Sequence, residues 1–243
     1  MENTRTKTTR NSLILLLTAA IWGMAFVSQS KGMDYMHPFT FNGVRSLIGA
    51  ASILVYILIS RKIAGDKAAP LDWKLNVKAG LLCGIFLTIA STLQQFGIKY
   101  TSVGKAGFIT TLYIIFVPMF GIFLKKKVAP VVWAAAVMAA VGMYLLCMTE
   151  SLRLGAGDIM VFLCAIAFAI QIMTVDHYAA RIDGAVVSCI QFTVCGVVCC
   201  IGALIWGQPT FGQLQEGLGA LLYAGVLSCG VGYRSEEHTS ELQ

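Results

Sequence analysis

Eight apolar runs follow one another along the chain, and most are long enough to cross a lipid bilayer. A helix rises about 1.5 Å per residue, so about 20 apolar residues cross a hydrocarbon layer about 30 Å thick. Charged residues make up only 12% of the chain, against about 25% in soluble domains. These features predict an all-α polytopic membrane protein. The predicted spans are residues 11–29, 39–60, 77–98, 104–124, 130–148, 158–175, 185–206 and 217–233.

Residues 104–124 form the most informative run, because they carry groups that a plain membrane anchor does not need. Gly104 and Gly107 are small enough to let another helix come close. Pro118 removes a backbone donor and predicts a gating bend in the second half of the helix. Three further residues bring hydroxyl groups: Thr110, Thr111 and Tyr113. We therefore predict that this helix forms the wall of a cavity between helices.

The basic residues favour an orientation with the N-terminus in the cytoplasm. In that orientation twelve Lys and Arg residues lie on the cytoplasmic side, and four lie outside: Lys31, Lys99, Lys105 and Arg153. Positive charge beside membrane spans determines topology, so the net charge of +6 does not indicate nucleic-acid binding. We predict a multi-pass protein of the bacterial cytoplasmic membrane, in contact with the lipid bilayer.

The eight cysteines all lie inside apolar runs, and none forms a CxxC pair. This distribution favours small apolar side chains in the core over disulfides or a metal site. His37 and His177 lie at loop edges. No cofactor and no metal is predicted.

A weak internal repeat appears when the sequence is shifted by 146 residues. Leu17 then falls on Leu163, and Trp22 falls on Phe168, so the first and sixth spans resemble each other. Arg45 falls on Gln191. A unit of five helices is odd in number, so the second copy must enter the membrane upside down, as in many transporters. The predicted organisation is an N-terminal tail over 1–10, a first unit over 11–149 and a partial second unit over 150–233.

The last ten residues, 234–243, interrupt the eighth apolar run with the sequence RSEEHTSELQ. This decapeptide resembles the translation of a common sequencing-library adapter, so we expect it to be non-native. The expected natural protein continues past residue 233 and has about 290 residues, on the logic of two complete units.

Four segments together resemble the EamA family of the drug/metabolite transporter superfamily, over about residues 11–233. They read TAAIWGMAFVSQS, FNGVRSLIGA, GIKYTSVGKAGFITTLYIIFVPMFGIF and GAGDIMVFLCAIAFAIQIM. The resemblance implies ten helices in two inverted repeats, both termini in the cytoplasm, and export of amino acids, other metabolites or drugs. Many members carry an acidic residue just after the fourth helix, where this chain has Lys125-Lys126-Lys127. A role for that acid therefore does not carry over.

Arg45 is the most conspicuous candidate, because a charge about 10 Å deep in a span is costly and usually faces a partner or a wet cavity. It either attracts an anionic substrate group, or it snorkels outward or binds helix-end carbonyls. The other candidates for the substrate pathway are polar residues within spans, and for each the alternative is packing between helices. They are Trp22, Gln94, Gln95, Thr110, Thr111, Tyr113 and Gln171.

The predicted function is a secondary transporter that exports small metabolites by alternating access, through a cavity ringed by the first, third, fourth and sixth helices. The alternative is a structural or scaffold membrane protein that encloses no cavity. An enzyme is not expected, because the chain has no HExxH, GxSxG or carboxylate pair. The oligomeric state stays open, with both a monomer and a homodimer compatible with the sequence.

Overall fold

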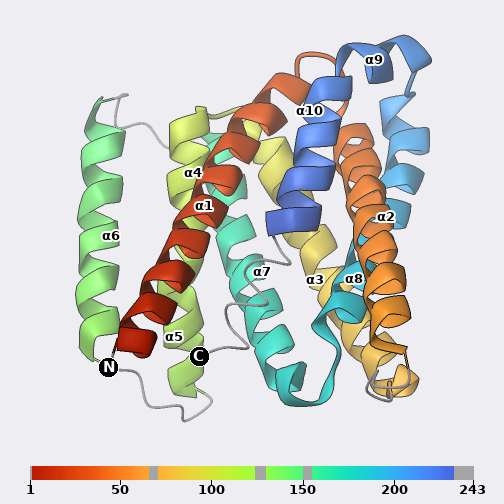
Figure 1. Cartoon of the computed structure of the whole chain (residues 1–243). Coiled ribbons are helices and arrows are strands. Elements are labelled where there is room, and N and C mark those ends of the chain that lie inside the picture. Colours follow the sequence, from red (N-terminus) through yellow and green to blue (C-terminus); the bar gives the residue numbers. More distant parts are fainter. Residues whose placement is uncertain (1, 66–70, 124–129, 150–154, 233–243) are drawn as a thin grey trace.

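The structure is a computed structural model that describes residues 2–65, 71–123, 130–149 and 155–232, and every element in these ranges is helical (Figure 1). The predicted adapter-like tail and the Lys125–Lys127 cluster lie outside the described residues. The helices are α1 (Glu2–Gly32), α2 (Pro38–Ala64), α3 (Trp73–Ile98), α4 (Val103–Thr111), α5 (Tyr113–Phe123), α6 (Pro130–Thr149), α7 (Ala156–Tyr178), α8 (Gly184–Gly202), α9 (Phe211–Glu216) and α10 (Leu218–Leu222). Wider π-helical turns follow α8 over Ala203–Gly207 and follow α10 over Tyr223–Gly232.

Five helical stretches in the described ranges are long and apolar enough to cross a membrane: Pro38–Ile63, Trp73–Ile98, Val103–Ile122, Ala156–Arg181 and Gly184–Gly207. They match the predicted second, third, fourth, sixth and seventh spans. Helices α1 and α6 cover the predicted first and fifth spans. The prediction of an all-helical multi-pass membrane protein is therefore confirmed, while the full count of ten helices stays a prediction.

Several helices begin at residues whose side chains cap the exposed backbone N–H groups. Asp72 accepts a hydrogen bond from the backbone N–H of Leu75 at 3.0 Å and starts α3. Ser102 caps α4, and Asp183 caps α8 through the N–H of Val186 at 3.2 Å. These caps explain why the chain turns back into the membrane at these points.

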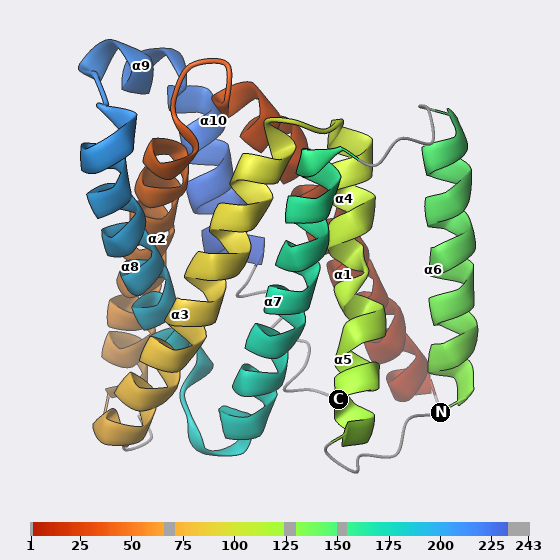
Figure 2. The same cartoon turned by 180° about the vertical axis from the view of Figure 1, so that it is seen from behind.

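Helices α2, α3, α7 and α8 form the packed centre of the bundle, with α3 against both α7 and α8. Figures 1 and 2 show α6 standing at one edge, beside α4 and α5. Consecutive spans run in alternate directions, so that α1 ascends in Figure 1 while α7 descends. The two helices that open the predicted units thus run in opposite senses.

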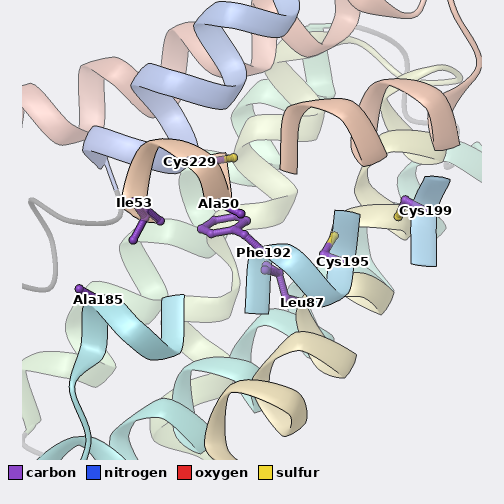
Figure 3. Packing of buried hydrophobic residues seen from close by; sticks show 8 residues of the cluster. All are labelled: Ala50, Ile53, Leu87, Ala185, Phe192, Cys195, Cys199 and Cys229. Carbon is purple, nitrogen blue, oxygen red and sulfur yellow. The ribbon is translucent and has the colours of Figure 1, made fainter. Parts of the chain in front are cut away.

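A cluster of apolar side chains fills the space between α2, α3 and α8 (Figure 3). Ala50 and Ile53 come from α2, and Leu87 comes from α3. Phe192 and two cysteines of α8 complete the centre of the cluster. The seven cysteines whose side chains the structure describes are free thiols.

The prediction of a close helix approach at Gly104 is wrong. A Cβ atom at Gly104 would meet no atom within 4 Å, and one at Gly107 would make an ordinary contact with Phe26 at 3.8 Å. The close crossing lies instead between the end of α3 and the start of α7. There a Cβ atom on Gly157 would lie 2.8 Å from the carbonyl oxygen of Gly97. Burial between two backbones, rather than the presence of glycine, decides which positions need it.

The predicted fourth span is interrupted at Leu112, six residues before Pro118. The hydroxyl of Thr111 donates to the carbonyl oxygen of Phe108 at 2.7 Å, where the N–H of Leu112 would bond in a regular helix. The N–H of Leu112 bonds the carbonyl of Ile109 instead, at 3.1 Å. Pro118 itself lies inside α5.

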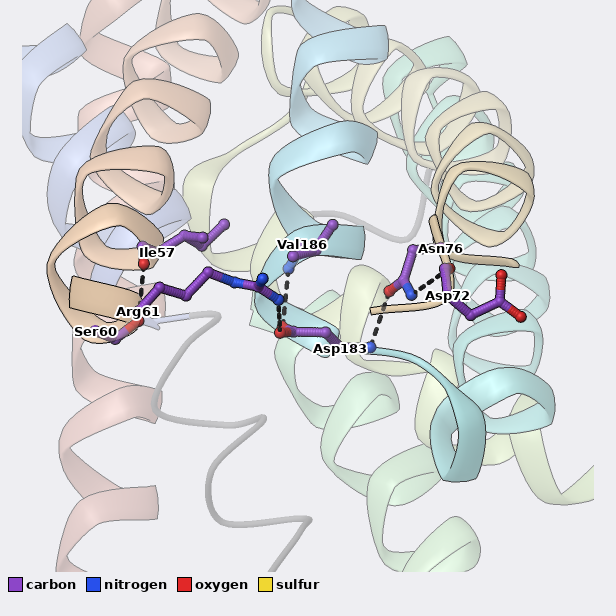
Figure 4. A network of polar contacts seen from close by, with 7 residues as sticks. All are labelled: Ile57, Ser60, Arg61, Asp72, Asn76, Asp183 and Val186. Atoms are coloured by element: carbon purple, nitrogen blue, oxygen red, sulfur yellow. Dashed lines mark hydrogen bonds and ion pairs between the residues drawn. The ribbon is translucent and has the colours of Figure 1, made fainter. Parts of the chain in front are cut away.

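A polar network ties together the ends of α2, α3 and α8 at the edge where α3 begins (Figure 4). The side-chain oxygen of Asn76 accepts from the backbone N–H of Asp183 at 2.8 Å, and its amide donates to the carbonyl of Asp72 at 2.8 Å. The carboxylate of Asp183 also pairs with Arg61 at 3.4 Å. These bonds fix the register of three helices at one membrane edge.

Candidate functional site

Arg45 is buried in the centre of the bundle, with only 6% of its surface exposed. Its Nε donates to Oδ1 of Asn42 at 3.0 Å, and its guanidinium carbon lies 5.8 Å from the centre of the Phe41 ring. Among the residues that the structure describes, no carboxylate pairs with it. Arg45 therefore does not snorkel to the surface, and a positive charge is held inside the apolar bundle.

Asn42 links Arg45 to the neighbouring helices α3 and α8. Its amide nitrogen lies 3.0 Å from the hydroxyl of Ser91 and 3.2 Å from the thiol of Cys199. The Ser91 hydroxyl lies 3.3 Å from the thiol of Cys195. We call these five residues the Arg45 cluster; they join α2, α3 and α8 through buried polar contacts.

Gln94 and Gln95 face different neighbours, as two adjacent helical residues must. Gln94 donates to the hydroxyl of Thr110 at 3.3 Å, which joins α3 to α4. Gln95 donates to the backbone carbonyl of Gln29 on α1 at 3.3 Å. The side-chain oxygens of Gln29 and Gln95 are both buried without a hydrogen-bond partner in the described structure.

Gln171 of α7 is buried and bonds the side chain of Gln191 on α8 at 2.9 Å. Gln191 in turn lies 3.5 Å from the hydroxyl of Ser188. A buried amide pair of this kind gives polar groups on both helices a hydrogen-bond partner without placing a charge in the bundle.

The remaining predicted site residues take no part in the bonds between helices described above. Trp22 on α1 and Tyr113 at the start of α5 are half-buried, and Pro118 is half-buried within α5. Thr111 is exposed and bonds only its own helix among the contacts described above. The structure thus brings together Gln94 with Thr110, but it turns Thr111 away from them.

Several of the buried polar residues in these contacts were not predicted from the sequence. Asn42 lies three residues before Arg45, on the same helix face, and this spacing could have revealed it. Cys195 and Cys199 are four residues apart and share a face of α8 in the same way. Ser91 lies one turn before Gln95. Gln29 gave no signal, because it stands near the end of a span.

A groove of about 500 Å³ lies along the C-terminal half of α7, between α3 and α5. Helices α3, α7 and α5 stand side by side in Figure 2. None of the residues predicted to line a substrate pathway lines this groove, and the first helix does not contribute to it. Its walls are Leu82, Phe120, Ile170, Met173, Thr174, His177 and Tyr178.

No group of three or more His, Cys, Asp or Glu side chains that could hold a metal ion occurs among the residues searched in the described ranges. Of the titratable groups that the structure describes outside the spans, His37, just before α2, is the one whose pKa is shifted by its surroundings. Burial lowers the pKa of His37, and the positive charge of Lys99 lowers it further. Its Nδ1 accepts the N–H of Phe39 at 3.3 Å, which requires the neutral ring.

Known proteins with similar sequences point to one family. A protein named "Uncharacterized transporter" from Archaeoglobus fulgidus is 31% identical over 171 residues, which is 68% of this chain and 48% of that protein. The chain thus spans about half the length of this relative. A second protein of the same name, from Clostridium kluyveri, is 25% identical over 91% of this chain and 74% of its own.

A solved crystal structure resembles the fold with a TM-score of 0.63 at 18% identity, over 95% of this chain and 79% of that one. This likeness concerns the arrangement of the helices alone. The sequence pattern of the EamA-like transporter family matches residues 10–148, which are more than half of the chain. This range covers most of α1, all of α2 to α5, nearly all of α6, and Asn42, Arg45 and Ser91 of the Arg45 cluster. The protein therefore belongs to the EamA-like transporter family, a family of transporters rather than enzymes.

Proposed function

We propose that the protein is part of a secondary transporter that exports small metabolites across the cytoplasmic membrane by alternating access. The substrate passes the Arg45 cluster on its way between the two faces. The predicted pathway residues Trp22, Gln94 and Thr110 lie on the helices around this cluster.

The burial of Arg45 carries this proposal. A positive charge without an acidic partner in the described bundle is expensive to hold in a membrane. Asn42 joins Arg45 to the hydroxyl of Ser91 and the thiol of Cys199, and this polar group provides a place for an anionic group of a passing solute. A protein that only anchors or scaffolds has no need of such a charge.

Helix packing supports the inverted repeat on which alternating access depends. In the proposed repeat, α1, α2 and α3 of the first unit correspond to α7, α8 and the segment Tyr223–Gly232 of the second. Exchange of the units then leaves the α2–α8 contact unchanged. It turns the α3–α8 contact into the contact between α2 and the segment Tyr223–Gly232. It also maps the α3–α7 contact onto the contact between α1 and that same segment. All of these contacts occur in the structure, as a pair of structurally equivalent units requires.

Export measurements with the complete gene test the role of Arg45. We expect Arg45→Gln to reduce metabolite efflux about tenfold to a hundredfold, the equivalent of losing one charge-assisted hydrogen bond, with unchanged abundance in the membrane. Lys99→Gln, which removes an exposed basic residue, is the matched control. Equal efflux from Arg45→Gln and Lys99→Gln would contradict the proposal.

Reporter fusions test the opposite insertion of the two units. A reporter placed before residue 10 should be cytoplasmic, whereas one placed in the loop over residues 150–154 should be outside. If both reporters were found on the same side, the two units would have the same orientation and alternating access through an inverted repeat would be excluded.

A further inference from the structure

We propose that the groove between α3, α5 and α7 binds an anionic phospholipid, with one acyl chain along α7 and the phosphate at the end where α3 begins and α7 ends. The proposal concerns the outer surface of the bundle and is independent of the transported substrate. It rests on the shape of the groove, on the apolar surface around it and on the charges at one end.

The groove has the chemistry of a site for a hydrocarbon chain. Its floor is the face of α7 that carries Ile170 and Met173, and its walls are Leu82 of α3 and Phe120 of α5. A volume of about 500 Å³ is in the range of small-molecule sites. Apolar atoms dominate its lining, so it offers no set of polar groups that would orient a small polar solute.

The surface around the groove is the face that the bilayer contacts. On α3 the neighbours Leu81, Ile85 and Ile89 are exposed by 46% to 52%, and on α7 Ile159 and Leu163 are exposed by 54% and 46%. Exposed apolar side chains at this density in a membrane protein face lipid tails. A hollow in such a face is filled by a lipid chain, because an empty cavity would lose its dispersion contacts.

One end of the groove is basic. Lys78 is exposed and lies one turn of α3 below Leu82, on the same face of the helix. Arg181 is exposed and follows three residues after Tyr178, which lines the groove. His177 forms part of the lining at this same end, with its ring against Tyr178 at a centroid distance of 4.9 Å. Basic pockets between membrane helices bind phosphate head groups.

Three acidic residues near this end have to be counted against the basic ones. Asp72 is exposed and caps α3 by accepting from the backbone N–H of Leu75. Asp183 is already paired with Arg61 at 3.4 Å. Asp176 is exposed beside His177 and has an interaction partner of its own. Lys74, which is exposed in the first turn of α3, adds a positive charge at this end. The balance of charge favours an anionic head group over a zwitterionic one.

Native mass spectrometry of the purified protein tests the site. The protein is released from vesicles that contain equal amounts of phosphatidylglycerol and phosphatidylcholine, and the retained lipids are counted. We expect the protein to retain phosphatidylglycerol in preference, and Leu82→Trp, which fills the groove, to abolish this preference. Leu81→Trp places the same ring on the neighbouring exposed position and should keep the preference. The double variant Lys78→Gln/Arg181→Gln should weaken it by about fivefold for each charge removed.

Three results would overturn the proposal: equal retention of the two lipids, equal behaviour of Leu82→Trp and Leu81→Trp, or no effect of the double charge variant. A photo-crosslinking amino acid at position 170 provides a second measurement that does not depend on filling the groove. A crosslink to phospholipid supports the site. A crosslink to another part of the polypeptide would show that protein fills the groove, and the lipid proposal would then be abandoned.

Discussion

Replacing Gly157 with alanine measures how tightly α3 and α7 cross. The added Cβ would lie 2.7 Å and 2.9 Å from the carbonyl carbon and oxygen of Tyr100 and 2.8 Å from the carbonyl oxygen of Gly97. All three are backbone atoms, so no side chain can rotate away, and one helix must move. Overpacking of this kind costs about 1–3 kcal/mol. The gain in helix propensity from glycine to alanine, about 0.5–1 kcal/mol, offsets only part of it.

Gly104→Ala is the matched control for this variant. Gly104 is the second residue of α4, as Gly157 is of α7, but its Cβ would meet no atom within 4 Å. The propensity change is therefore similar in both variants, and the difference between them isolates the packing cost. Thermal unfolding in one detergent should place Gly157→Ala about 2–12 °C below Gly104→Ala. Equal melting temperatures would refute the close crossing of α3 and α7.

Three further changes have defined outcomes. Asn76→Ala leaves the backbone N–H of Asp183 without its acceptor and should lower the free energy of unfolding by about 1–3 kcal/mol in thermal melts, whereas Lys74→Ala, at an exposed position of the same turn, should change it little. Thr111→Val removes the hydroxyl that occupies the Phe108 carbonyl, so solid-state NMR shifts of Leu112 should become those of a regular helix; unchanged shifts would contradict this cause. The lowered pKa of His37 means that the folded state prefers the neutral ring. The contribution of His37 to the free energy of unfolding is therefore fully present above pH 6.5 and is lost as the pH drops through the pKa of the folded state. Thermal melts of a His37→Gln variant at several pH values should lack this acid dependence.

The placement of the five long apolar spans could be predicted from the sequence because a bilayer imposes a simple rule. Every backbone group inside it must bond within the chain, so a long apolar run becomes a helix. The predicted second span, residues 39–60, and α2 differ mainly at their ends. The helix begins one residue earlier, at Pro38 after the His37 cap, and continues four residues further, to Ala64 before Gly65, which has a positive φ of 51°.

Features that depend on contact between helices could not be predicted in the same way. Gly104 and Gly157 look alike in the sequence, but only the second is pressed against another backbone. Pro118 is the obvious helix breaker in the sequence, but the interruption lies six residues earlier, at Leu112, next to the hydroxyl of Thr111 that occupies the Phe108 carbonyl. The groove on α7 had no sequence signal, because its lining consists of ordinary apolar residues from three separate helices.

The buried polar groups differ between the two proposed units, which a symmetrical scaffold would not need. Under the shift of 146 residues, Arg45 and Asn42 correspond to Gln191 and Ser188, and both pairs interact over the same three-residue spacing. The side-chain oxygen of Gln191 also accepts a hydrogen bond from the amide of Gln171, which carries no charge. The position that corresponds to Gln171 in the first unit is Ala25, which has no polar side chain to offer. The proposed first unit therefore holds a charge where the proposed second unit holds a hydrogen-bonded amide pair, and this asymmetry favours Arg45 as the proposed contact with an anionic solute.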